Sequence, residues 1–200
     1  MKITNIKQQV KQTDRYSVFV DGKYCFSLSE TALLKSGLTS GQELTPAQID
    51  EYKQLSADDK VYNRALRYVA MRPRSTWELT TYLRRKEASD SLIESTINRL
   101  TALGLLNDAA FADSFVRDRQ LLRPTSRRKL IVELKKKRLS DEHIEAALTQ
   151  NELDEADSLT QVIAKKRRQA KYQDDDKLMQ YLARQGFGYS DIKSALAKED

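Results

Sequence analysis

The sequence has few of the residues on which enzyme active sites and metal centres depend. Its 200 residues include one cysteine, Cys25, and one histidine, His143. A single cysteine excludes an intramolecular disulfide and suits a reducing cytoplasm, where we expect the protein to reside. One cysteine and one histidine cannot build a zinc site or a Cys–His nucleophile pair without many carboxylates. We therefore expect no metal and no cofactor, and we interpret His143 as a structural or exposed side chain.

Long apolar runs and phosphate-binding glycine motifs are also missing. No stretch approaches the roughly 18 apolar residues of a membrane span, and the N-terminus has no apolar signal core, so we expect no membrane partner. The six glycines are scattered and match neither G-x-x-x-x-G-K-[ST] nor G-x-G-x-x-G. These absences exclude the common nucleotide-binding loops.

Positive charge is present and is unevenly distributed. The net charge is +6, with a sequence pI near 9.3. Residues 61–106 hold eight basic and four acidic side chains, and residues 107–152 hold ten and eight, whereas the two ends of the chain are balanced. Such an excess is compatible with contact to a polyanion, although it does not bear on the fold.

The first 45 residues have the pattern of a β-hairpin followed by a short helix. In "RYSVFVDGKYCFSLS", the apolar residues Tyr16, Val18 and Val20 alternate before Asp21-Gly22, and Tyr24, Phe26 and Leu28 alternate after it. Asp-Gly between alternating runs is the strongest short hairpin signal, and we expect each run to turn these residues to one face. "KITNIKQQV" is a candidate third strand. A short helix over 29–35 should stop at Gly37, and Pro46 should open another.

From about residue 58 onward the spacing is helical and repeats itself. Three segments align: "ELTTYLRRKEASDSLIESTI", "KLIVELKKKRLSDEHIEAAL" and "KLMQYLARQGFGYSDIKSAL". Each carries a leucine pair at i,i+4, and the copies are offset by 51 and 48 residues; the leucines are Leu79/Leu83, Leu130/Leu134 and Leu178/Leu182. Ser75 with Glu78 forms a capping box, Ser89 and Ser140 are expected N-caps, and Gly188 is a poorer cap.

These patterns predict a mainly α-helical protein of tandem three-helix repeats, three copies in an elongated, curved array, with a small N-terminal β-hairpin element. The expected parts are residues 1–57 (β-hairpin and short helices), 58–106, 107–152 and 153–200, each of the last three being one repeat.

The stretch "RRKLIVELKKKR" (127–138) carries seven positive charges against one negative. At 100° per residue its leucines form a buried stripe, and Arg128, Lys129, Lys135 and Lys136 fall on the side away from it. Lys135 and Lys136 correspond to Arg84 and Arg85 in the first copy, and "KKRRQAK" (165–171) adds a cluster on another helix. A face that binds a polyanion is one interpretation, and an ordinary solvated face is the other.

Two further interpretations of these residues remain. Glu133-Leu134-Lys135 is an E-x-K with Asp113 and Asp118 upstream, a set that a metal-dependent nuclease could use, although it lies in a helical pattern. Trp77 and the tyrosines could stack on bases, but a lone tryptophan beside a helix cap is more often packing between repeats.

Four segments resemble the RecX family, regulatory proteins of bacterial RecA. They are "RPRSTWELTTYLRRK" (72–86), "LTALGLLNDAAFADSFVRDR" (100–119), "RRKLIVELKKKRLSDEHIEAAL" (127–148) and "YLARQGFGYSDIKSAL" (181–196). The family usually has glycine after the basic cluster, where this chain has Arg138-Leu139. The helix must therefore end without its glycine, at a cost of about 1 kcal/mol.

The resemblance implies a non-enzymatic regulator with no catalytic residue. Its implied partners are the RecA filament and, without sequence specificity, the phosphate backbone of single-stranded DNA, and we expect a monomer. By binding in the filament groove it would restrain RecA ATP hydrolysis, strand exchange and co-protease activity. The contact candidates are Arg84, Arg85, Arg128, Lys129, Lys135, Lys136 and Lys137. A general DNA- or RNA-binding helical module, independent of RecA, is the alternative.

Overall fold

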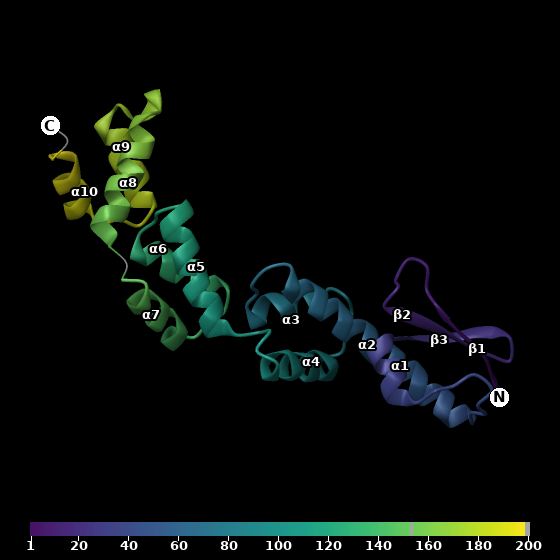
Figure 1. Cartoon of the computed structure of the whole chain (residues 1–200). Helices are drawn as coiled ribbons and strands as arrows, with labels where there is room; N and C mark the ends of the chain where they lie inside the picture. The colour runs from purple at the N-terminus through teal and green to yellow at the C-terminus, as the bar shows by residue number, and fades with distance from the viewer. Residues whose placement is uncertain (153, 199–200) are drawn as a thin grey trace. The chain divides into compact units, whose positions relative to one another are not determined.

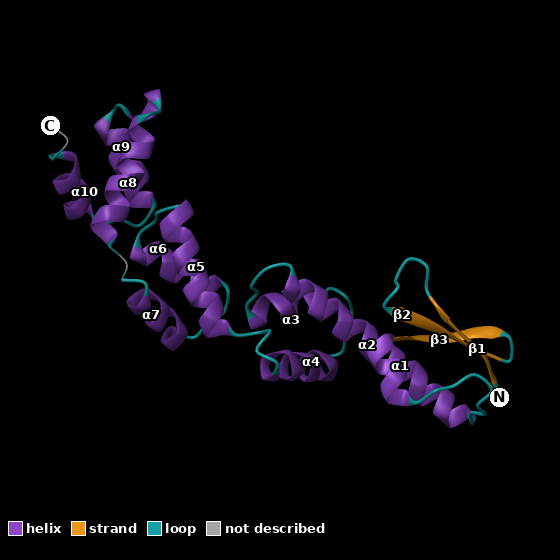
Figure 2. Ribbon diagram, in the orientation of Figure 1, coloured by secondary structure: helices purple, strands orange, loops and turns teal. Residues whose placement is uncertain are grey.

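The computed structural model describes residues 1–152 and 154–198, so positions 153, 199 and 200 of the expected third repeat lie outside the described residues. The chain divides into two compact units. The first comprises Met1–Arg72 and Thr80–Leu103, and the second comprises Pro73–Leu79 and the chain from Gly104 onward. Figure 2 shows strands at the N-terminal end and helices through the other described residues.

The first unit consists of a small sheet and the helices that follow it (Figure 1). In chain order its elements are β1 (Ile3–Gln8), β2 (Arg15–Val20), β3 (Lys23–Ser29), α1 (Glu30–Ser36), α2 (Pro46–Ala70), the second half of α3 (Thr76–Arg84) and α4 (Asp90–Ala102). Gly37 ends α1 in the left-handed conformation, with φ of 64°, as predicted. The capping box of Thr45 and Gln48 begins α2, which Pro46 opens.

The predicted hairpin and third strand are confirmed. The sheet is antiparallel in the order β1-β2-β3, and both turn residues have positive φ, 48° at Asp21 and 77° at Gly22. One detail of the prediction is wrong. The register shifts between the pairs Val18–Phe26 and Phe19–Tyr24, so the alternation breaks at Cys25 and Tyr24 is 54% exposed instead of facing the core.

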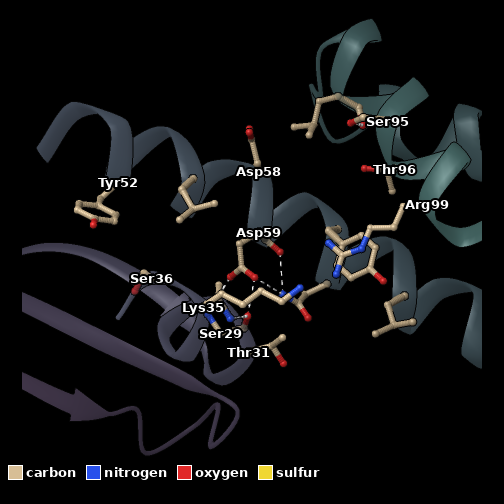
Figure 3. A pocket seen from close by; sticks show the side chains of 16 residues that line it. Ser29, Thr31, Lys35, Ser36, Tyr52, Asp58, Asp59, Ser95, Thr96 and Arg99 are labelled. Atoms are coloured by element: carbon tan, nitrogen blue, oxygen red, sulfur yellow. Dashed lines mark hydrogen bonds between the residues drawn. The ribbon is translucent and has the colours of Figure 1, made fainter. Parts of the chain in front are cut away.

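A buried ion pair attaches α2 to the sheet. The Arg15 guanidinium lies 2.8 Å from Asp59, and both side chains are less than a tenth exposed. Asp59 also accepts hydrogen bonds from the Ser29 backbone N–H at 2.9 Å and from the Ser29 hydroxyl at 2.6 Å (Figure 3). Because its partners satisfy this carboxylate, we interpret the cleft in Figure 3 as a packing feature of the first unit. Helix α2 continues through residues 57 and 58, where we expected the first repeat to begin.

The described residues of the second unit form helices joined by short loops, and they hold two separate cores. Its elements are the start of α3, then α5 (Asp108–Leu122), α6 (Arg127–Lys136), α7 (Asp141–Gln150), α8 (Glu155–Arg167), the short 3-10 helix η1 (Ala170–Tyr172), α9 (Asp175–Arg184) and α10 (Tyr189–Leu196). One core is formed by α5, α6 and α7, and the other by α8, η1, α9 and α10. All the leucines of the predicted stripes are fully buried.

The local signals that define the repeats are also confirmed. The Ser75 hydroxyl accepts from the Glu78 N–H at 3.2 Å, and the Ser75 N–H donates to the Glu78 carboxylate, which completes the capping box. Ser89 and Ser140 cap α4 and α7 with their side chains, whereas Gly188 has no side-chain cap to offer α10. The mainly helical fold with tandem three-helix units and an N-terminal β element is therefore as predicted.

A left-handed residue follows the middle helix of every repeat. Glu87, Arg138 and Gly186 have φ of 61°, 59° and 91°, and they are spaced by the same 51 and 48 residues as the leucine pairs. Arg138 stands where the RecX-like pattern has glycine, and it adopts the conformation that glycine would adopt there. The helix thus keeps its geometry, and the strained backbone of a non-glycine residue carries the cost.

Candidate polyanion-binding site

The exposed cations of the expected contact surface differ in their pairing. Arg84 lies 3.1 Å from Asp90, and Lys135 lies 3.0 Å from Asp141. These two pairs occupy equivalent positions in successive repeats, each joining the end of the middle helix to the start of the third. Both pairs are well exposed, so each contributes little to the stability of the protein. The cation of each pair can therefore leave its aspartate for another anion.

Three candidates form no ion pair with any described residue. Arg85, Arg128 and Lys136 are exposed, and Arg85 and Lys136 hold equivalent slots in their repeats. Arg85 lies just past α3 in the first unit, whereas Arg128 and Lys136 lie on α6 in the second. Their charge is available to a polyanion without displacing an acidic neighbour.

Lys129 and Lys137 instead contact residues of the second unit that lie far away in the chain. The Lys137 ammonium lies 2.6 Å from the Glu78 carboxylate, and the Lys129 ammonium donates to the side-chain oxygen of Gln185. Both lysines are half-buried. Their partners lie 59 and 56 residues away in the chain. Positions 78 and 129 are equivalent, as are 137 and 185, so the same contact is made twice with donor and acceptor reversed.

The N-cap serines reinforce both junctions. The Ser75 hydroxyl donates to the Lys137 carbonyl at 3.3 Å, and the Ser126 hydroxyl donates to the Gln185 carbonyl at 2.7 Å. In each case a serine that caps a middle helix also satisfies a carbonyl at the end of the next middle helix, where helices leave acceptors unpaired. Lys137 therefore has a structural role as well as a charge.

The structure brings together two basic clusters that are separate in the sequence. A cleft of about 460 Å³ in the second unit is lined by side chains of α5, the loop after it, α6, α8 and the end of α9. Its cations are Arg119, Arg123, Lys129, Lys165 and Lys166. The single acidic residue that lines it, Glu133, lies 2.9 Å from Arg119 and is neutralised by it. The cleft is thus strongly positive and suits an anion.

One polar atom of this cleft lacks a partner. Of the buried side-chain oxygens and nitrogens in the described residues, the Thr125 hydroxyl is the one without a hydrogen-bond partner. Thr125 lines the cleft beside the exposed Leu121 and Leu122. An unsatisfied buried hydroxyl costs about 1–3 kcal/mol, which makes Thr125 a weak point in the packing of the cleft wall.

Sequence reasoning missed Arg119, Arg123 and Thr125. The signal was the two arginines in "RQLLRPT", Arg119 and Arg123, but the cleft forms only where α5, α6, α8 and α9 come together. The stretch 165–171 was recognised as basic, and the structure places Lys165 and Lys166 in the same cleft as Lys129.

The residues of the nuclease hypothesis do not converge. Glu133 is paired with Arg119, Lys135 with Asp141, and Asp113 with Arg117 and Asn151. Within the described residues no group of three or more His, Cys, Asp or Glu side chains is placed to hold a metal. His143 is half-buried in the first turn of α7, and Trp77 is 40% exposed. The described part of the chain also contains no helix long and apolar enough to cross a membrane.

Family models match the chain along most of its length. The descriptions and matched residues are the regulatory protein RecX N-terminal domain (1–45) and the first, second and third three-helix domains of RecX (62–100, 107–148 and 153–196).

Comparison with individual proteins gives the same family. "Regulatory protein RecX" of Lactobacillus delbrueckii subsp. bulgaricus is 40% identical over 146 residues, which are 73% of this chain and 54% of that protein. The chain thus spans about half the length of such relatives. The Bacillus subtilis protein of the same name is 32% identical over 199 residues, 97% of this chain and 75% of that protein. A crystal structure of regulatory protein RecX, 27% identical, superposes with a TM-score of 0.73 and covers 100% of this chain and 99% of that one.

Proposed function

The chain belongs to the RecX family, and we propose that it is a non-enzymatic regulator that binds the RecA filament on single-stranded DNA and restrains RecA activity. The observation that carries this proposal is the match of the N-terminal and all three three-helix RecX domains along one chain. We also propose that it acts in the bacterial cytoplasm, because a regulator of RecA would work beside the chromosome.

The charge distribution supports a role for electrostatic attraction. A filament on single-stranded DNA presents phosphates, and the exposed cations Arg85, Arg128 and Lys136 have no acidic partner among the described residues. Such cations raise the rate of encounter and the affinity without selecting a base sequence. Occupation of the filament groove would then hinder the subunit movements that accompany ATP hydrolysis and strand exchange.

ATP hydrolysis by RecA of the same organism on single-stranded DNA tests this proposal. The protein is titrated into the reaction at two salt concentrations, and the DNA is examined afterwards in the presence of Mg²⁺. We expect inhibition well below one protein per RecA, weaker inhibition at high salt, and intact DNA. No inhibition at stoichiometric excess would overturn the proposal, and DNA cleavage would overturn its non-enzymatic part.

A matched pair of charge-reversal variants locates the surface. The double variant Arg128→Glu, Lys136→Glu should weaken inhibition of RecA ATP hydrolysis about tenfold or more. Each reversal removes a contact with a phosphate or with an acidic side chain of the filament. Lys193→Glu with Lys198→Glu changes the net charge equally, at exposed lysines beyond α9, and should inhibit like the unmodified protein. Equal loss in both double variants would mean that net charge alone drives binding.

The alternative function, a nucleic-acid-binding module independent of RecA, is favoured by one observation. The cleft around Lys129, Lys165 and Lys166 is positive without any contribution from a partner protein. A RecA-independent module would bind DNA without RecA as tightly as it binds the filament. It would affect RecA only by competing with it for the DNA strand. Raising the DNA concentration would then abolish inhibition, whereas a filament-binding regulator would still inhibit.

A further inference from the structure

A second cleft, on the first unit, combines positive charge with aromatic rings and has no acidic side chain among its lining residues. Its volume is about 500 Å³, and its walls come from α2, α3, β3, the start of β2 and the loop before it. We call it the α2 cleft. Its cations are Arg15, Lys60, Arg64 and Arg67. Because Arg15 is buried against Asp59, three charges remain uncompensated within the cleft.

The three cations form a row along one face of α2. Lys60, Arg64 and Arg67 are spaced at i, i+4 and i+7, which places them within about 60° of arc and spreads them over roughly 10 Å of helix. All three are exposed, and none forms an ion pair with a described residue; Arg67 donates only to the Asn63 carbonyl, at 3.4 Å. No Asp or Glu occurs between Lys60 and Trp77. A row of cations without acidic residues matches a chain of phosphates rather than a protein surface of mixed charge.

Tyrosines line the same cleft. Tyr68 and Tyr82 are stacked on each other, with ring centroids 4.1 Å apart and planes within 1°. Both are half-buried. Tyr24, which the shift of register turns away from the core, is 54% exposed and meets the edge of Phe19. Tyr24 is therefore an accessible ring beside a row of cations, the combination by which proteins hold unpaired bases.

We propose that the α2 cleft binds single-stranded nucleic acid, with Lys60, Arg64 and Arg67 on successive phosphates and a base stacked against Tyr24. A duplex keeps its bases stacked inside and would leave the rings unused, and an acidic peptide would use the cations alone. The site is separate from the expected contact residues. It assigns to the first unit a function that does not require RecA, so this inference and the proposed function can fail independently.

The experiment measures binding of the full chain to three labelled probes by fluorescence anisotropy, without RecA. The probes are an oligothymidylate, an abasic single strand of the same length and a duplex. We expect the order of affinity to be oligothymidylate above abasic strand, because the abasic strand keeps the phosphates and lacks the stacking bases. The duplex should bind more weakly than oligothymidylate.

Variants assign the binding to this cleft. Arg64→Glu should weaken binding of oligothymidylate about tenfold. The slope of the logarithm of the binding constant against the logarithm of the salt concentration should become shallower by about 0.7, because one phosphate contact is lost. Tyr24→Ala should weaken binding of oligothymidylate by about fivefold to a hundredfold and leave the abasic strand nearly unaffected, since stacking on one ring is lost. Tyr24→Phe should retain the affinity.

Lys35→Glu is the matched control, because Lys35 is exposed on the same unit but lines the other cleft, seen in Figure 3. It should bind like the unmodified protein, and circular dichroism should show every variant folded. Binding of oligothymidylate within twofold of wild type by both Arg64→Glu and Tyr24→Ala would overturn the inference. Equal affinity for oligothymidylate and the abasic strand would refute base stacking.

Discussion

The Lys137 ammonium lies 2.6 Å from the carboxylate of Glu78, which is largely buried at the start of α3. Glu78 also accepts from the Ser75 backbone N–H, so one carboxylate completes a helix cap and a junction between repeats. Within residues 127–138, Lys137 therefore has a structural role, whereas an exposed lysine such as Lys136 has no ion pair with a described residue.

Replacing Lys137 should therefore destabilise the protein, whereas replacing its neighbour should not. Lys137→Met removes the ammonium that lies against the buried Glu78 carboxylate, and we expect a loss of about 1–3 kcal/mol in the free energy of unfolding. Lys136→Met removes the same charge from an exposed site and should change it by no more than about 0.5 kcal/mol. Urea denaturation followed by circular dichroism gives both values. Equal losses would refute the structural role of Lys137.

Arg138→Gly should stabilise the protein. Arg138 has φ of 59°, a conformation that glycine adopts without the steric cost of a Cβ atom. The expected gain is up to about 1 kcal/mol, reduced by the greater freedom of glycine in the unfolded chain. Arg138→Ala removes the same charge but keeps the Cβ atom. If the alanine variant matched the glycine variant in thermal unfolding, charge rather than backbone strain would be the cause.

The sequence predicted those features that local patterns determine. The buried leucines such as Leu130, the caps such as Ser140 and the Asp21-Gly22 turn depend on neighbours within a few residues, and all were confirmed. Tyr24 was predicted wrongly because alternation assumes a regular strand, and one shift of register reverses the face of a side chain.

The candidate site was less predictable because its interactions join distant parts of the chain. A helical wheel places Lys129 opposite the leucine stripe, yet Lys129 reaches Gln185, 56 residues away. No periodicity reveals that Lys165 meets Lys129 in one cleft, or that Tyr82 stacks on Tyr68 beside the cations of α2. Charge can be counted in a sequence, but its pairing depends on packing between helices.

Gly186→Ala should be strongly destabilising. Gly186 has φ of 91°, and a Cβ atom there would lie 2.6 Å from the Ser126 hydroxyl oxygen. That hydroxyl caps α6 and donates to the Gln185 carbonyl, so it cannot move without losing a hydrogen bond. We expect a loss of about 2 kcal/mol or more in unfolding experiments. Gly41→Ala is the control, since its φ is also about 90° but no atom lies within 4 Å of the added Cβ. If the two variants lost equal stability, the clash with Ser126 would not contribute.

Asp174 should titrate at an unusually low pH. The Lys177 backbone N–H donates to this N-cap carboxylate, and this hydrogen bond, with the Lys177 side chain, lowers its pKa below the ordinary value. A lowered folded pKa means that the cap stabilises α9 above the unfolded pKa, near 4, and that this contribution is lost as pH falls through the folded pKa. NMR titration of the carboxyl carbon measures it. In Asp174→Asn, which keeps the cap without the charge, this part of the pH dependence should disappear. A pKa at or above the ordinary value would contradict the cap.

The pair between Lys135 and Asp141 should restrain polyanion binding by the second unit. The two groups lie 3.0 Å apart and both are exposed, so Asp141 neutralises a lysine beside Lys136 at little gain in stability. Asp141→Asn keeps the size of the side chain, and we expect it to raise affinity for the RecA–DNA filament about twofold to fivefold at low salt. Glu142→Gln is the control, because Glu142 is an exposed acid in the same turn with no ion pair to a described residue. If both variants raised affinity equally, the gain would come from net charge alone, and the freed lysine would have no particular role.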